Sequence, residues 1–382
     1  MRHTLFLMIL LLSLSCTSRS QARRDSIIDT LSASLSDSIF PTDTLRLLFV
    51  GDLMQHQGQI NAARTSTGYD YSTCFAYVKE EIKKADLSIA NLEVTLGGKP
   101  YKGYPAFSAP DEFLTAIHDA GFNVLVTANN HSLDRGKSGL ERTIQLIDSL
   151  KVPHAGTYIN ADEREKKYPL LLEKNGFRIA LLNYTYGTNG IPVTPPNIVN
   201  YIDTAIIVKD IEESKAMKPD AIIACMHWGI EYQSLPDKEQ KFLTDWLLRK
   251  GVNHIIGCHP HVVQPIEVRE DSLTNGKHLV VYSLGNYISN MSARRTDGGL
   301  MVKMELVKDS TTRLNHCEYS LVWTARPAQS GKKNHQLLPI NFPTDSISVN
   351  ARNSLRIFAN DARSLFSKHN RGIKEYLFYK KK

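Results

Sequence analysis

Short apolar runs alternate with amphipathic stretches along most of this chain, and this alternation limits the folds it can form. Runs this short and apolar are typical of strands buried between helices, so the pattern predicts a layered α/β domain beginning near Leu45. The clearest helical pattern covers residues 236–250 and stops at Gly251. The expected strands are residues 47–50, 87–90, 124–127, 179–182, 221–225, 255–256 and 279–282.

Side chains that can bind a metal ion stand two to five residues after the end of five of these runs. They are Asp52, Glu93, Asn130 with His131, His227, and the pair His259 and His261. In open α/β sheets the carboxyl ends of the strands line the ligand crevice, so residues far apart in the sequence can meet there. Carboxylates, an amide oxygen and imidazoles together suit first-row divalent ions such as Mn, Fe or Zn. The pattern therefore predicts a site for one or two divalent metal ions, since one carboxylate could bridge two ions.

Each of these residues alone has an ordinary structural explanation. Asp52 suits a turn or a helix cap, Glu93 a surface carboxylate, and His227 a buried core histidine. His259 and His261 are more specific, because an extended H-x-H segment stiffened by proline places both imidazoles on one side of the chain. Five such coincidences at strand ends favour a shared site.

The first 16 residues have the pattern of a lipoprotein-type signal peptide. A basic start precedes an apolar run over residues 5–14, which is shorter than the ~20 residues that span a bilayer. Cys16 follows a small residue, where such a signal is cut and the cysteine acylated. We therefore expect export to the cell envelope with a lipid anchor in the membrane, with plain secretion and an uncleaved anchor as alternatives. Residues 17–44 are polar and suit a flexible tether.

Cysteine usage and charge restrict the remaining possibilities. Beyond Cys16, the cysteines at 74, 225, 258 and 317 show no dense disulfide spacing, so the fold does not depend on bridges, although a bridge between Cys225 and Cys258 stays open. The formal net charge of +7 favours an anionic partner such as a polyacid, a phosphorylated glycan or a lipid head group. No nucleic-acid-binding motif is present, and no nucleic acid is expected as a partner.

Six sequence blocks resemble those of the CapA-type poly-γ-glutamate capsule-synthesis proteins and occur in that family's order. They are GDLM at 51–54, NLE at 91–93, ANNHSLD at 128–134, HWG at 227–229, GCHPH at 257–261 and SLGN at 283–286. The resemblance supports a domain over residues 45–310, and the residue pattern predicts a C-terminal strand and helical appendage over 311–382. Because that family resembles the calcineurin-like metallophosphoesterases, the implied fold is a four-layer α/β/β/α sandwich of metallophosphoesterase type.

The resemblance also implies roles for individual residues. Metal contacts would come from Asp52, Glu93, Asn130, His227, His259 and His261. His131 would be the transition-state or leaving-group partner. Phosphoesterases usually begin with D-x-H, but Met54 stands two residues after Asp52, so His56 is a possible substitute ligand. Glu93 stands where the phosphoesterases have a bridging aspartate.

Two functions remain open from the sequence. In the first, the site is a metal-dependent hydrolase or transferase centre acting on an anionic surface polymer, such as poly-γ-glutamate, or on a phosphoester. His131 would donate or relay a proton, and Glu231 would act as an acid–base group or orient a ligand. Lys102 and Arg135 are candidates for holding the anionic substrate. In the second, the domain is a non-enzymatic polymer-binding or scaffold component of a synthesis and export complex that includes membrane proteins.

Overall fold

The computed structural model describes residues 43–271 and 276–379, which belong to one compact unit. The expected signal peptide and residues 17–42 of the expected tether lie outside the described residues. The first strand, β1 (Asp43–Leu53), starts two residues before Leu45. Within the described ranges, no helix combines the length and the apolar character that a membrane crossing requires.

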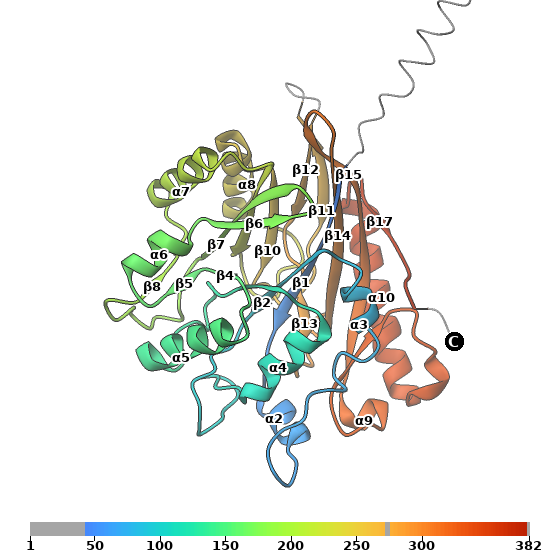
Figure 1. Cartoon of the computed structure of the whole chain (residues 1–382). Helices are drawn as coiled ribbons and strands as arrows, with labels where there is room; N and C mark the ends of the chain where they lie inside the picture. The colour runs from blue at the N-terminus through green and yellow to red at the C-terminus, as the bar shows by residue number, and fades with distance from the viewer. Residues whose placement is uncertain (1–42, 272–275, 380–382) are drawn as a thin grey trace, which may run out of the picture. The chain divides into compact units, whose positions relative to one another are not determined.

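Two β-sheets form the centre of the unit (Figure 1). The first sheet has the order β16-β15-β14-β1-β2-β3-β4, with β13 paired to β1 and β17 paired to β15. Besides β1 it contains β2 (Leu87–Leu92), β3 (Val124–Val126), β4 (His154–Ala155), β13 (Asn286–Ile288), β14 (Gly298–Lys308), β15 (Thr312–Ala325), β16 (Gln336–Pro339) and β17 (Lys374–Glu375).

The second sheet has the order β11-β12-β10-β9-β7-β6. Its strands are β6 (Leu170–Lys174), β7 (Phe177–Thr185), β9 (Ala221–His227), β10 (His254–Cys258), β11 (Ile266–Glu270) and β12 (Lys277–Val281). A small separate pair joins β5 (Thr157–Tyr158) to β8 (Ile198–Val199). All seven expected strands are confirmed, because each expected run lies in or overlaps one of these strands.

The two sheets pack face to face because side chains alternate between the two faces of each strand. In β1, Leu47 and Phe49 share a core with Ile223 of β9 and Ile256 of β10, whereas Leu48 belongs to a different core. The first of these cores lies between the sheets. The sheets are therefore the two inner layers of the unit.

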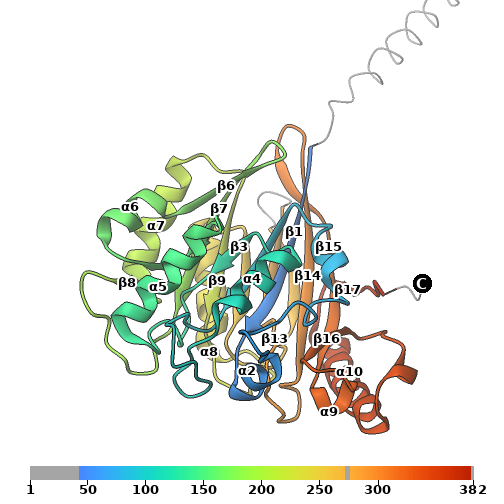
Figure 2. The same cartoon turned by 60° about the horizontal axis from the view of Figure 1, so that its bottom comes forward.

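Helices cover the two outer faces, which completes the four-layer α/β/β/α sandwich that was predicted (Figures 1 and 2). On the first sheet, Phe113 and Ile117 of α4 pack with Leu48 of β1. On the second sheet, Ile211 of α7 and Leu247 of α8 belong to one core. All the helices of the described residues, including those that do not cover an outer face, are α2 (Gln57–Ala63), α3 (Lys79–Ile82), α4 (Asp111–Ala120), α5 (Gly136–Ser149), α6 (Ala161–Lys167), α7 (Thr204–Ala216), α8 (Lys238–Lys250), α9 (Pro327–Ser330), the 3-10 turn η1 (Thr344–Ser346) and α10 (Val349–His369).

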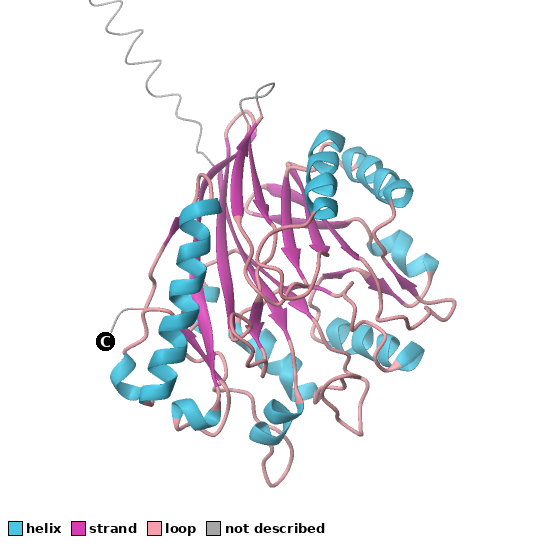
Figure 3. Ribbon diagram, turned by 180° about the vertical axis from the view of Figure 1, so that it is seen from behind, coloured by secondary structure: helices cyan, strands magenta, loops and turns pink. Residues whose placement is uncertain are grey.

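The segment after residue 311 continues the first sheet. β15 pairs with β14 along its length, and β16 and β17 pair with β15. The long helix α10 lies beside these strands (Figure 3) and packs Phe366 against Tyr319, with ring centroids 4.9 Å apart. Phe358 and Phe366 of α10 belong to the core between the sheets. The predicted strand and helical appendage thus lie within the same compact unit.

Candidate metal centre

Strands from both sheets bring the candidate ligands together at their carboxyl ends. β1, β2 and β3 run parallel, with Asp52 in register with Asn91. β9 and β10 also run parallel, with His227 in register with Cys258, the residue before His259. Because parallel strands end at the same edge of a sheet, the residues at these ends meet in the crevice that open α/β sheets use for ligands.

Five of the expected ligands form two groups whose ligand atoms lie within 4.8 Å of one another. One group is Glu93, His227 and His259, and the other is Asp52, Glu93 and His261. All five side chains are buried, with at most 3% of each residue exposed. Glu93 is common to both groups, as a carboxylate that bridges two ions would be.

Three buried atoms of these groups lack a hydrogen-bond partner. They are Asp52 Oδ2, Glu93 Oε1 and His259 Nδ1. Buried polar atoms in folded proteins are nearly always paired, so unpaired atoms gathered in one site need an explanation. Two carboxylate oxygens and an imidazole nitrogen are ordinary ligands of a divalent ion, and their donor chemistry fits one.

The protonation states also suit ligands. Burial lowers the pKa of His259 to about 3 and moves the pKa of His227 well below its ordinary value, so both rings are neutral and each has a nitrogen lone pair available. Burial raises the pKa of Glu93, and the nearby Asp52 carboxylate raises it further. Ionising Glu93 beside the Asp52 carboxylate is therefore electrostatically unfavourable, and a bound cation would offset this repulsion.

The turn that carries His259 and His261 is not extended, so the expected H-x-H geometry was wrong. His259 has φ 103° and His261 has φ 59°, both left-handed conformations that cost energy for residues other than glycine. The backbone N–H of Tyr232 donates to the Pro260 carbonyl at 2.8 Å and ties this turn to the loop after β9. The two imidazoles nevertheless enter the same site, with centroids 5.9 Å apart.

Asn130 and His131 follow β3 and border the ligand groups. Asn130 Oδ1 lies 2.8 Å from His227 Nε2. His131 Nδ1 lies 2.7 Å from Asp134 Oδ2, and Phe107 packs edge-on against the His131 ring. Asp134 therefore fixes the orientation of the proposed proton donor. No role was predicted for Asp134 from the sequence, although it stands three residues after His131 in the same block.

The exposed side of the site is acidic and aromatic. Glu231 Oε1 lies 4.0 Å from His261 Nε2 and is partly open to solvent. Tyr186 packs on the His259 ring, with centroids 4.4 Å apart, and Tyr232 lies near the His261 ring. Both tyrosines are about half exposed, at 47% and 53%. The structure thus brings Glu231 to the site and adds two aromatic residues to which the sequence analysis gave no ligand role.

Three other predicted residues lie outside the two ligand groups. His56 precedes α2, accepts a hydrogen bond from the Asn290 backbone at 3.4 Å, and has a pKa that burial lowers to about 4. Lys102 is exposed in a short bridge with Ser108, and Arg135 precedes α5. Among the described residues, no hydrogen bond or ion pair joins these side chains to the ligand groups. Their roles as substitute ligand and anion-binding residues stay predictions.

Comparison with known families decides the classification. Residues 46–291 match the model of the family described as bacterial capsule synthesis protein PGA_cap. The chain belongs to this family. The matched range contains both ligand groups together with His131 and Glu231. The predicted resemblance to capsule-synthesis proteins is thereby confirmed.

This chain is similar to two Bacillus proteins. It is 28% identical over 286 residues to the capsule biosynthesis protein CapA of Bacillus anthracis, covering 72% of this chain and 66% of that protein, just under two thirds. It is also 28% identical over 281 residues to the PGA biosynthesis protein CapA of Bacillus subtilis (strain 168), covering 72% of this chain and 71% of that protein.

Solved structures with a similar chain path include two proteins of low sequence identity. The NAD nucleotidase NadN of Haemophilus influenzae matches with a TM-score of 0.48 and 12% identity, over 89% of this chain and 65% of NadN. The calcineurin-like phosphoesterase YfkN of Bacillus subtilis matches with a TM-score of 0.46 and 14% identity, over 85% of this chain and 99% of the YfkN chain.

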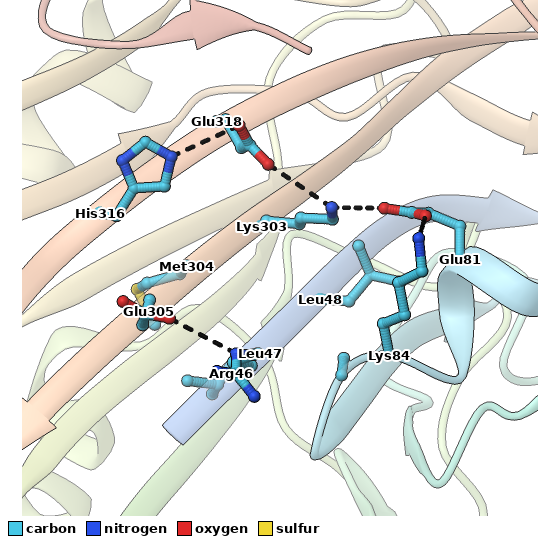
Figure 4. Close-up of a pocket in the computed structure, with 11 residues that line it drawn as sticks. Arg46, Leu47, Leu48, Glu81, Lys84, Lys303, Met304, Glu305, His316 and Glu318 are labelled. Carbon is cyan, nitrogen blue, oxygen red and sulfur yellow. Dashed lines mark hydrogen bonds and ion pairs between the residues drawn. The ribbon is translucent and has the colours of Figure 1, made fainter. Parts of the chain in front are cut away.

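A cavity of about 400 Å³ lies away from the candidate metal centre, on the outer face of the first sheet (Figure 4). Arg46 of β1 lines this cavity. Arg46 stands six residues before Asp52, and six residues extend about 20 Å along a strand. The charged groups of the cavity pair with one another: Lys303 with Glu81, and Arg46 with Glu305 at 3.4 Å. The first of these ion pairs connects α3 to β14, and the second joins the neighbouring strands β1 and β14.

Proposed function

We propose that this PGA_cap protein is a metal-dependent hydrolase or transferase of the cell envelope that acts on an anionic surface polymer or a phosphoester. The observation that carries the proposal is the pair of buried ligand groups that share Glu93 and contain unpaired ligand atoms. The family assignment and the names of the Bacillus relatives support a capsule polymer as the partner. The lipid anchor at Cys16 belongs to this proposal and rests on the sequence pattern alone.

Asp52, Glu93, Asn130, His227, His259 and His261 would hold one or two ions of Mn, Fe or Zn. Such an ion supplies Lewis acidity and lowers the pKa of a bound water. His131, held by Asp134, is placed beside the ligand groups to give a proton to a leaving oxygen. Glu231 stands at the exposed side, where it can accept a proton from an incoming nucleophile. Lys102 and Arg135 are proposed to contact the anionic substrate.

One observation favours the alternative of a polymer-binding or scaffold protein. Met54 stands where phosphoesterases carry a histidine ligand, and its side chain is 2% exposed within an apolar core. The group of Asp52, Glu93 and His261 therefore receives no fourth ligand from that position. A site that lacks this ligand would bind the carboxylates of the polymer without cleaving the polymer chain.

The test measures metal content and hydrolysis together in the full chain. We expect one or two equivalents of Mn, Fe or Zn after purification, lost in both His259→Ala and Glu93→Ala and retained in His118→Ala, which changes an exposed histidine of α4. Hydrolysis of poly-γ-glutamate or bis(p-nitrophenyl) phosphate that disappears with His131→Ala would support the enzyme. Retention of poly-γ-glutamate by variants of His131 and His259, without hydrolysis, would support the scaffold. Absence of metal even after reconstitution would exclude the metallohydrolase.

A further inference from the structure

Asn91 lies between the two carboxylates of the candidate metal centre, and neither the family match nor the proposed function gives it a role. We propose that Asn91 is a positioning residue. Its amide binds one oxygen of Asp52 and one oxygen of Glu93, and so leaves the other oxygen of each carboxylate for a divalent cation. This inference rests on the proposed metal site.

The hydrogen bonds divide the carboxylate oxygens into two sets. Asn91 Nδ2 donates to Asp52 Oδ1 at 2.8 Å and to Glu93 Oε2 at 3.2 Å. The buried oxygens without a hydrogen-bond partner are the other two, Asp52 Oδ2 and Glu93 Oε1. One amide group therefore accounts for which oxygens are paired and which are unpaired.

The unpaired oxygens are also the ones that face the histidines. Asp52 Oδ2 lies 3.3 Å from His261 Nδ1. Glu93 Oε1 lies 3.8 Å from His227 Nε2 and 4.0 Å from His261 Nε2. Glu93 thus offers the same oxygen to both ligand groups, while its second oxygen is held by Asn91. The oxygens that Asn91 leaves free are therefore the ones that face the histidines and could bind a cation.

A second asparagine fixes which way the Asn91 amide points. Asn129 Nδ2 donates to the Leu92 carbonyl at 2.8 Å, and Asn129 Oδ1 accepts from the His131 backbone N–H at 3.1 Å. A carbonyl only accepts and a backbone N–H only donates, so Asn129 has one orientation. Its Nδ2 also donates to Asn91 Oδ1 at 3.2 Å. The Asn91 oxygen must therefore face Asn129, and its NH₂ group must face the carboxylates.

This arrangement has a consequence for metal affinity. Groups that orient the ligands of a metal commonly change affinity by about 10–100-fold when removed. Without Asn91, each carboxylate can rotate and both of its oxygens compete for the same cation. The loss of Asn91 should thus weaken metal binding even though every ligand remains.

The experiment titrates Mn²⁺ alone into the metal-free full chain by calorimetry. We expect Asn91→Ala to bind Mn²⁺ about 10–100-fold more weakly than the native protein, and Asn91→Ser, which keeps one donor, to fall between them. The matched control is Asn253→Ala. Asn253 also supports a strand, accepting from the Ile222 backbone at 2.8 Å, but it precedes β10 at the opposite end from the ligands. This control should bind Mn²⁺ with native affinity even if its thermal stability falls.

A double variant separates positioning from general destabilisation. If Asn129 acts through Asn91, Asn129→Ala should weaken Mn²⁺ binding in the native background and add little to Asn91→Ala. Native affinity in Asn91→Ala and Asn91→Ser, with binding still lost in His259→Ala, would overturn the role of Asn91 and leave the metal centre intact. An equal loss in Asn253→Ala would also overturn it. Failure of the native chain to bind Mn²⁺ would remove both the metal centre and this inference.

Discussion

His261 Nδ1 lies 3.3 Å from Asp52 Oδ2, and both side chains are almost completely buried. Burial alone lowers the pKa of an imidazole, but the adjacent Asp52 carboxylate outweighs this effect and raises the pKa of His261. The same contact holds the pKa of Asp52 below its ordinary value despite burial. A proton on His261 Nδ1 would therefore lie next to Asp52 Oδ2, the oxygen that a cation would bind.

Metal affinity should consequently fall as the pH is lowered from 8 to 6. Because the pKa of His261 is raised, more of the rings are protonated as the pH falls than for an ordinary imidazole. A binding cation must displace that proton, at a cost of up to about tenfold in affinity per pH unit below that pKa. Mn²⁺ titrations in two buffers of different ionisation enthalpy should show proton release on binding. Equal affinity at both pH values, without proton release, would contradict competition between the proton and the metal.

Glu93→Gln should raise the thermal stability of the metal-free protein at pH 8 while abolishing metal binding. The pKa of Glu93 is raised by burial and by Asp52, so its ionisation opposes folding increasingly as the pH rises above the unfolded value. The neutral amide removes that repulsion at similar size. Melting curves should show a gain of a few degrees at pH 8 that shrinks at pH 5. A loss of stability at pH 8 would show that the carboxylate pair is not strained.

Asp134→Asn should lower turnover without lowering metal content. Asp134 Oδ2 accepts hydrogen bonds from His131 Nδ1 at 2.7 Å and from the Phe107 backbone at 2.8 Å, so it fixes the orientation of the ring. We expect kcat for bis(p-nitrophenyl) phosphate to fall by at least about tenfold with little change in KM. Asp119→Asn is the control, because Asp119 contacts His118 on the surface of α4. Unchanged turnover in Asp134→Asn would argue against proton transfer by His131.

The main features of the fold and most of the candidate ligands were predictable because they depend on local patterns. Each apolar run specifies a buried strand, and the residue after the strand must lie at the carboxyl end of its sheet. Glu93 and His227 could therefore be assigned to one site without any knowledge of how the sheets pack. The family resemblance then supplied the four-layer arrangement.

The remaining features depend on contacts that sequence spacing does not encode. The left-handed backbone of His259 and His261 results from the packing of their turn against the loop after β9, which carries Tyr232. Asn91 acquires its position from a hydrogen bond to Asn129, a residue 38 positions later in the chain. No periodicity indicates such a pair, although both residues stand in blocks that already contain predicted ligands.

His254→Asn should make folding stability less dependent on pH. His254 accepts a hydrogen bond from the Leu279 backbone at 3.0 Å, and burial lowers its pKa to about 3. Because the unfolded chain takes up the proton first, the native protein loses stability as the pH falls below about 6.5, by about 2 kcal/mol from this residue at pH 5. Asparagine keeps an acceptor but does not titrate. Urea unfolding at pH 7.5 and pH 5 should show a difference smaller by about that amount, and an unchanged difference would assign the acid sensitivity to other groups.

Gly51→Ala should destabilise the protein severely, although Gly51 is not a ligand. A Cβ atom at this position would overlap the backbone oxygen of Gly285, which accepts a hydrogen bond from the Asp52 N–H at 3.1 Å. Backbone atoms cannot rotate away, so β1 and the segment before β13 would have to separate, at an expected cost of at least about 3 kcal/mol. Gly187→Ala is the control, because no atom lies within 4 Å of its added Cβ, and it should change stability by less than about 0.5 kcal/mol. Urea unfolding of both variants measures the difference, and near-native stability in Gly51→Ala would mean that this strand pairing can shift without loss of packing.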